Sequence, residues 1–132
     1  SVVVKEMIDC IFVERWESRT DEGNEIKKVL NYIEHNIKDG ITLDSAAEYV
    51  NMSPSYFSKI FKKTMGVNFI VYVTDRRIEM AKEMLQNTDM SVINIAAELS
   101  YNETNYFSKV FKKKVGVSPT EYRQRFSGVQ AE

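Results

Sequence analysis

The sequence predicts an all-α protein in which two helix-turn-helix subdomains are joined by a long central helix. Three observations predict it. Apolar residues recur at helical spacing through most of the chain, glycine and proline stand where helices would end or begin, and one stretch returns fifty positions later. The composition agrees, because 43% hydrophobic and 28% charged residues in a chain of 132 are ordinary for a globular protein.

The repeat is clearest in an octamer that reads YFSKIFKK at residues 56–63 and YFSKVFKK at residues 106–113. The same shift of fifty positions, applied without a gap, places the Ala-Ala-Glu of residues 46–48 on residues 96–98. We therefore expect one structural unit to occur twice, with the segment between the copies fixing their relative placement.

Residues 1–24 are predicted to be a linker or the remnant of a preceding domain, because the sequence just before Glu25 has no apolar periodicity. For residues 2–16 an amphipathic helix, a dimerising stub, a short strand through residues 2–4 and disorder all remain open. The chain starts at Ser1 rather than Met, so we expect it to be part of a longer protein.

The first lobe is predicted at residues 25–67 and holds three helices. An apolar stripe marks the first helix, which should end at Asp39-Gly40: Ile26, Val29, Leu30, Ile33 and Ile37. Thr42 is a suitable N-cap for a short second helix with these inward residues: Leu43, Ala46, Ala47 and Val50. Ser53 and Pro54 then open a third helix that runs to about Met65 and stops at Gly66.

Residues 68–87 are predicted to form the linker helix, about 30 Å long at 1.5 Å per residue. Its expected inward residues are Ile70, Val73, Ile78, Ala81, Met84 and Leu85. The second lobe, residues 88–127, repeats the pattern with helices at residues 92–99 and 103–115 and a turn at residues 100–102. A capping box at residues 118–121 opens the last helix, and residues 128–132 are a tail.

Each repeated helix separates an apolar face from a short, polar and basic face. The apolar sets are Phe57, Ile60, Phe61 and Thr64 in the first copy and Phe107, Val110 and Phe111 in the second. The polar sets are Ser55, Ser58, Lys59 and Lys62, and Asn105, Ser108, Lys109 and Lys112. One lysine-rich face usually does no more than keep a helix soluble, but its recurrence at the same helical positions favours a binding role.

The formal net charge of −1 argues against a nucleic-acid partner, but the charge is unevenly distributed. Residues 53–64 carry three lysines and no acid, and residues 103–114 carry four lysines and one glutamate, so each segment is +3. Residues 1–24 hold six acids against three bases. A phosphate backbone meets the local charge rather than the total, so the repeated helices remain candidates for it.

Material for catalysis or metal binding is scarce. Cys10 is the only cysteine, which leaves no intrachain disulfide or cysteine cluster and fits a reducing cytoplasm. His35, the only histidine, stands among the apolar residues of the first helix and is expected to be structural. No P-loop, dinucleotide glycine pattern or membrane-length apolar run occurs, so we predict a protein that is not an enzyme, needs no cofactor or metal and contacts no membrane.

With these motifs in place, the chain resembles the DNA-binding domain of the AraC/XylS family of transcription regulators over about residues 25–126. The match is carried by Arg77-Ile78, Ala81, Ile95-Ala96-Ala97-Glu98, the octamer at residues 106–113, Gly116, Ser118-Pro119 and Tyr122-Arg123. The resemblance implies about seven helices in two homeodomain-like lobes that read major-groove segments one DNA turn, or ~34 Å, apart. It is closest to members in which this domain is the output of a response regulator, whereas other members carry a ligand-binding domain ahead of it, and both arrangements remain open here. Ser100 departs from the family's usual glycine.

A recognition helix needs short or flexible side chains with donors and acceptors at their tips, because the major groove is only about 12 Å wide. The predicted base-reading residues are Ser55, Ser58, Lys59, Thr104, Asn105, Ser108 and Lys109, with Lys59, Asn105 and Lys109 as the chief readers. The predicted phosphate contacts are Ser53, Tyr56, Lys62, Lys63, Tyr106, Lys112, Lys113 and Lys114, although the two tyrosines also suit the edge of the core.

The predicted partner is double-stranded DNA with a bipartite site, which one monomeric domain could read, and RNA polymerase is a further expected partner. The alternative is a helical protein-interaction module that docks RNA polymerase or a partner regulator. The weak net charge supports that alternative, and salt dependence of binding separates the two.

Overall fold

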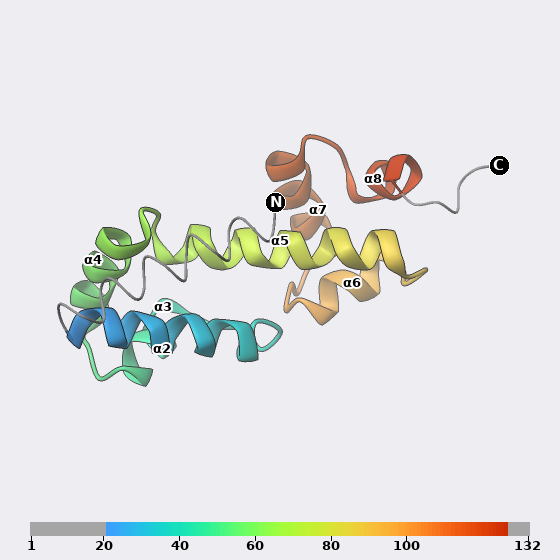
Figure 1. The fold of residues 1–132 in the computed structure, drawn as a ribbon. Helices are drawn as coiled ribbons and strands as arrows, with labels where there is room; N and C mark the ends of the chain where they lie inside the picture. The colour runs from blue at the N-terminus through green and yellow to red at the C-terminus, as the bar shows by residue number, and fades with distance from the viewer. Residues whose placement is uncertain (1–20, 127–132) are drawn as a thin grey trace. The chain divides into compact units, whose positions relative to one another are not determined.

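The computed structural model describes residues 21–126, which form seven helices and no strand (Figure 1). The helices, in chain order, are α2 (Asp21–Asn36), α3 (Leu43–Tyr49), α4 (Pro54–Met65), α5 (Phe69–Asn87), α6 (Val92–Glu98), α7 (Thr104–Val115) and α8 (Pro119–Phe126). The all-α prediction is confirmed for this part of the chain. The predictions made for residues 1–20 and 127–132 lie outside the described residues.

The described residues divide into two compact units, which we call the first and the second unit. The first unit holds residues 21–35 and 41–70, and so contains most of α2, all of α3 and α4, and the start of α5. The second unit holds the rest of α5 with α6, α7 and α8. It also takes residues 36–40, which lie between α2 and α3 in the sequence.

Two details of the helices differ from the prediction. The helix α2 begins at Asp21, so residues 21–24, predicted as linker, are helical. Ile70, predicted to point inward, is 56% exposed, because α5 begins at Phe69 and this ring takes the buried position.

The core of the first unit is built on the predicted stripes. Buried Ile26, Val29 and Ile33 come from α2, and the small Ala46 and Ala47 come from α3. Three aromatic rings close this core: Phe69 meets Phe57 and Phe61 edge to face, with ring centroids 5.4 Å apart in each pair. Each such fully buried side chain stabilises the unit by roughly 1.5–3 kcal/mol.

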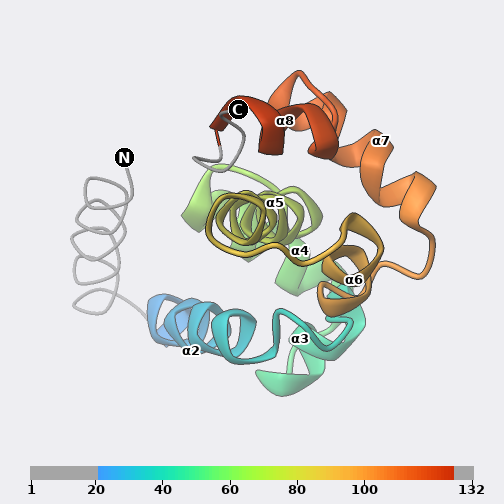
Figure 2. The same ribbon diagram turned by 90° about the vertical axis from the view of Figure 1, so that its right-hand side faces the viewer.

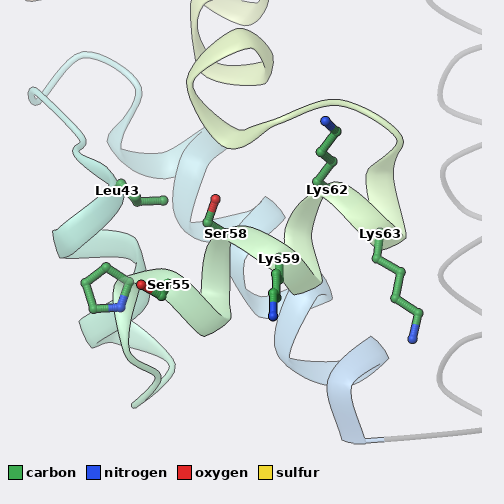
Figure 3. Close-up of a pocket in the computed structure, with 7 residues that line it drawn as sticks. Leu43, Ser55, Ser58, Lys59, Lys62 and Lys63 are labelled. Carbon is green, nitrogen blue, oxygen red and sulfur yellow. The ribbon is translucent and has the colours of Figure 1, made fainter.

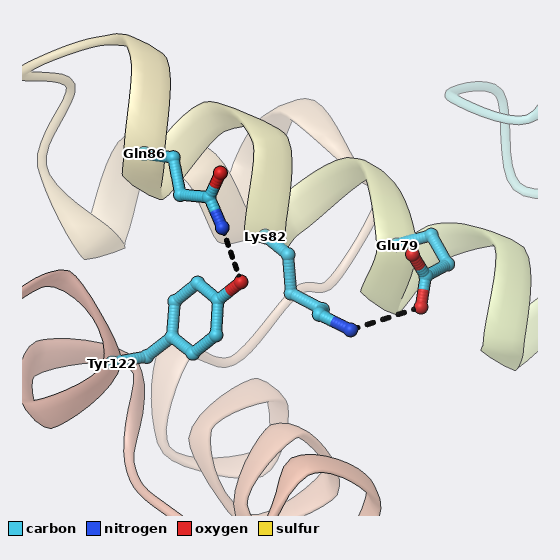
Figure 4. A network of polar contacts seen from close by, with 4 residues as sticks. All are labelled: Glu79, Lys82, Gln86 and Tyr122. Carbon is cyan, nitrogen blue, oxygen red and sulfur yellow. Dashed lines mark hydrogen bonds and ion pairs between the residues drawn. The ribbon is translucent and has the colours of Figure 1, made fainter. Parts of the chain in front are cut away.

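The core of the second unit repeats this design around α5. Its buried members are Ile78, Ala81, Leu85, Ile95, Ala96, Leu99, Phe107, Phe111 and Tyr122. Within this unit α6 lies on one side of α5 and α8 on the other (Figure 2). The hydroxyl oxygen of Tyr122 accepts a hydrogen bond from Gln86 of α5, close to the half-buried ion pair of Lys82 and Glu79 (Figure 4).

The repeat is not free of gaps, which corrects the alignment predicted from the sequence. The caps that open α3 and α6, Thr42 and Ser91, differ by 49 positions, and so do the left-handed residues Asn51 and Ser100. The helices α4 and α7 still differ by 50. The second turn therefore holds one more residue than the first, and the buried Ala47 corresponds to the buried Ala96 rather than to the exposed Ala97.

Candidate nucleic-acid interface

Local sequence fixes where α4 begins and ends. The Ser53 hydroxyl oxygen accepts a hydrogen bond from the Tyr56 backbone N–H at 3.2 Å, and Pro54 occupies the first helical position. Gly66 ends the helix with φ +83°, a left-handed conformation that glycine adopts without steric cost. Phe57, Ile60, Phe61 and Thr64 are buried, so the opposite side of α4 is left to solvent, as predicted.

The solvent side of α4 forms one wall of a shallow groove of about 680 Å³ (Figure 3). Its lining brings together five predicted contact residues, namely Ser55, Ser58, Lys59, Lys62 and Lys63. The three lysines are exposed and Ser58 is half-buried. The groove therefore combines serine hydroxyl groups with lysine ammonium groups, an arrangement suited to a polar, negatively charged ligand.

Two apolar residues of this groove were missed in the sequence. Pro54 is part of its lining, and Leu43 reaches it from the first turn of α3, pointing toward α4 (Figure 3). The apolar spacing placed Leu43 in the core, but its side chain is only half-buried. Its position directly after the Thr42 cap could have indicated this, because the first residue of a helix lies at the edge of the core.

The helix α7 presents the same surface in the second unit. Phe107 and Phe111 are buried, Asn105, Lys109, Lys112 and Lys113 are exposed, and Thr104 and Ser108 are half-buried. Gly116 ends the helix in the left-handed region, as Gly66 does in α4. The polar and basic positions predicted in the two copies thus lie on the outer face of one helix in each unit.

The tyrosines lie at the edge of these faces. Tyr56 is 46% exposed and Tyr106 is 59% exposed, while the buried phenylalanine that follows each of them faces the core. The ring of Tyr106 lies 6.0 Å from that of Tyr101, centroid to centroid. Each tyrosine is thus partly packed and partly open to a ligand.

Lys114 differs from the other lysines of α7. Its Nζ lies 3.0 Å from Oδ1 of Asp75 on α5, in an ion pair within the second unit. The same position in α4 is Thr64, which is buried. Lys114 therefore lies toward α5, at the edge of the face formed by Lys109, Lys112 and Lys113.

Other kinds of site have little support among residues 21–126. No group of three or more His, Cys, Asp or Glu side chains is placed to hold a metal ion, and no helix in this range is long and apolar enough to cross a membrane. His35 Nδ1 lies 2.9 Å from the backbone oxygen of Asn31, one turn earlier in α2. His35 is exposed on the surface of α2.

Comparison with known families gives a match to a model described as a helix-turn-helix domain, over residues 46–125. The chain is similar to the regulatory protein PocR of Salmonella typhimurium, with 39% identity over 108 residues. It is also similar to the uncharacterized HTH-type transcriptional regulator YtdP of Bacillus subtilis, with 41% identity over 97 residues. These matches cover 82% and 74% of this chain but only 36% and 13% of the relatives, so the chain spans a fraction of their length.

Two solved structures are similar to this chain in fold. One is the C-terminal domain of the two-component response regulator yesN from Fusobacterium nucleatum, with 34% identity and a TM-score of 0.74. That match covers 76% of this chain and 98% of the other. The second is the C-terminal domain of AraT, a response regulator from Geobacillus stearothermophilus, with 35% identity, a TM-score of 0.77 and coverage of 82% and 90%. The named relatives are regulators rather than enzymes.

Proposed function

The chain belongs to the AraC-type family of helix-turn-helix domains, which bind double-stranded DNA in transcription regulation, and from this premise we propose that it reads a bipartite site through α4 and α7. The observation that supports the proposal is the recurrence of one exposed face, with short polar side chains beside lysines, on the same helix of each unit. A single monomeric domain would then contact two half-sites about one DNA turn apart.

The base-reading roles follow from the donors and acceptors on each face. Lys59 and Lys109 can donate to guanine O6 and N7, and Asn105 can pair with adenine N6 and N7. The hydroxyl groups that assist them are Ser55, Ser58, Thr104 and Ser108. These seven residues make up the proposed reading surface.

Phosphate contacts position the protein without reading the sequence. We assign them to the exposed lysines Lys62 and Lys63 in α4 and Lys112 and Lys113 in α7, with the hydroxyl groups of Tyr56 and Tyr106 as further contacts. Ser53 contributes through the N-terminus of α4, which it caps. Lys114 is assigned a weaker phosphate contact, because binding there competes with its ion pair to Asp75.

The context we propose is the output domain of a larger regulator. Both curated relatives are much longer than this chain, and two similar structures are C-terminal domains of response regulators. A preceding receiver domain would supply the signal, and the DNA-bound domain would act on RNA polymerase. The reducing cytoplasm predicted from the single cysteine fits this role.

The proposal is tested by selecting bound sequences from a random duplex library, followed by titrations of the selected site with the wild-type chain and three variants. Lys59→Ala should relax the preference at one half-site, and Asn105→Ala and Lys109→Ala at the other, each by about 1–3 kcal/mol. Affinity should fall about 10³ to 10⁵ fold between 50 and 200 mM salt if six to ten phosphates are contacted.

A matched control is Lys28→Ala, which removes the same charge from α2, where Lys28 pairs with Glu25 at 3.0 Å. This variant should keep the preference of the wild type at both half-sites. Absent or salt-insensitive DNA binding would contradict the proposal and favour the protein-docking alternative.

A further inference from the structure

The turn between α6 and α7, residues 99–103, is held by parts of the second unit that lie far away in sequence. The Ser100 hydroxyl group donates a hydrogen bond to the backbone oxygen of Lys38, in the segment 36–40. The Lys38 ammonium group lies 3.6 Å from Glu98, the last residue of α6. The segment 36–40 is therefore attached to the start of this turn at two points.

Arg77 of α5 joins the same cluster from the other side. Its Nε donates to the backbone oxygen of Ile37 at 3.1 Å, and its guanidinium carbon lies 6.0 Å from the centre of the Tyr101 ring. The side chain is half-buried, and its burial lowers the pKa of the guanidinium group from the ordinary value. The guanidinium group keeps its charge near neutral pH, as arginine does in proteins. A partly desolvated cation therefore lies beside the aromatic ring of Tyr101.

Tyr101 in turn contacts two aromatic residues of the helix α7. Its ring centroid lies 5.2 Å from that of Phe107, the fully buried anchor of α7, and 6.0 Å from that of Tyr106. Phe107 lies between Asn105 and Ser108 in the sequence, so a shift of this anchor moves the proposed readers on either side of it. The contacts form a continuous path from Arg77 through Tyr101 to the first turns of α7.

The first unit places α4 by local means instead. The Ser53 hydroxyl group caps α4 and Pro54 presets its first turn, whereas Glu103, at the cap of α7, makes no side-chain capping bond. Because equivalent residues at the start of the two turns are 49 positions apart, the residue of the first unit that corresponds to Tyr101 is Met52. The second unit therefore depends more on tertiary contacts for the position of its recognition helix.

We propose that Arg77, which lies on α5 and touches no base, is a positioning residue for DNA reading by α7, acting through Tyr101 on the turn 99–103 and on Phe107. The inference rests on the proposed function and adds to it a determinant of specificity outside both recognition helices. Loss of Arg77 should relax the preference at the half-site read by α7 and leave the half-site read by α4 unchanged.

The test compares Arg77→Met and Arg77→Lys with Lys82→Met, using the selected bipartite site and duplexes with substitutions in one half-site at a time. Arg77→Met keeps an unbranched side chain and removes the guanidinium group. Lys82→Met is the matched control, because it removes one cation from the same helix, where Lys82 pairs only with the half-buried Glu79 among the described contacts (Figure 4). The two Met variants lose the same charge, so general electrostatic attraction falls equally.

We expect Arg77→Met to reduce discrimination at the α7 half-site about tenfold, the order of a desolvated cation–π contact, with no change at the α4 half-site. Arg77→Lys should recover part of this discrimination, and Lys82→Met should show the wild-type preference at both. Tyr101→Leu, which keeps an apolar side chain next to Phe107, should reproduce the effect of Arg77→Met. It tests the inference in place of Arg77→Met if that variant does not fold.

Equal losses at both half-sites, or full discrimination in folded Arg77→Met and Tyr101→Leu, would overturn this inference and leave the proposed function in place. A wild-type chain that shows no sequence preference would overturn both.

Discussion

The two helix-turn-helix units contain nearly the same lysine-rich helix, α4 in the first and α7 in the second, but hold it differently. In the first unit four residues, 50–53, join α3 to α4, and hydroxyl caps open both helices. In the second unit five residues, 99–103, join α6 to α7, and only α6 has a side-chain cap. The comparison shows that a sequence repeat can preserve an exposed polar and basic face while the interactions that position this face change from local to tertiary.

The extra residue of the second turn explains part of this difference. Ser100 occupies the left-handed region with φ +68°, where a residue other than glycine is strained, and its hydroxyl group bonds to Lys38. Asn51 occupies the same region in the first turn with φ +58°, and asparagine tolerates this conformation better. The first turn thus follows from its own residues, whereas the second is stabilised by the segment 36–40.

The largest expected effect comes from the buried anchors, Phe57→Ala and Phe107→Ala. Each should cost about 3–5 kcal/mol of unfolding free energy, because a ring that is fully buried leaves a cavity. Amide hydrogen exchange should locate each loss in the unit that carries the substitution. Ile93→Ala, at a position 65% exposed, is the control and should cost far less. Equal loss of protection in both units for either variant would mean that the units unfold together.

Changes to the N-cap residues of α4 and α7 should alter the unfolding free energies of the two units in opposite directions, by about 1 kcal/mol. Ser53→Ala should lower the unfolding free energy of the first unit by about that amount, because it removes the bond to the Tyr56 N–H. Glu103→Ser should raise that of the second unit by about 0.5–1 kcal/mol by adding the missing cap. Thermal unfolding measures both, with Glu103→Gln to separate the loss of charge. If Glu103→Ser does not raise the unfolding free energy, the backbone of the turn 99–103 does not allow the residue at position 103 to cap α7.

The strain in the second turn can be isolated with Ser100→Gly and Ser100→Ala. Both variants lose the hydrogen bond to the Lys38 oxygen, but only glycine relieves the positive φ. The glycine variant should therefore be more stable than the alanine variant by about 1 kcal/mol, measured by chemical denaturation. The pair Asn51→Gly and Asn51→Ala provides the comparison in the first unit. Equal stability of the two Ser100 variants would mean that the turn relaxes without its side chain.

The smallest expected effect concerns neighbouring lysines of α7. Lys113→Ala should weaken binding to all DNA sequences alike and lower the salt slope by about one phosphate contact. Lys114→Ala should change the slope less, because its ammonium group already pairs with Asp75. Fluorescence titrations at several salt concentrations measure both slopes. A larger change for Lys114 than for Lys113 would contradict the assignment of Lys114 to the edge of the reading face.

Much of the fold followed from local sequence, because its signals act within a few residues. The Thr42 and Ser53 caps, Pro54, and the glycines that end α4 and α7 were all predicted where the structure has them. The apolar faces of the repeated helices were predicted for the same reason, since helical periodicity by itself decides which side chains can share a core. The sequence by itself thus determined the helices, and the resemblance it carries identified the family.

Tertiary structure decided what depends on contacts between distant residues. Equivalent residues of α3 and α6 are 49 positions apart, but the chance match of Ala46-Ala47-Glu48 to residues 96–98 indicated 50 in the sequence. Only the geometry of the two turns revealed the difference. The position of Lys114 required Asp75 from α5, and the support for Tyr101 required Arg77 and the segment 36–40. These contacts join residues far apart in the chain, and neither spacing nor propensity contains information about which distant side chains will meet.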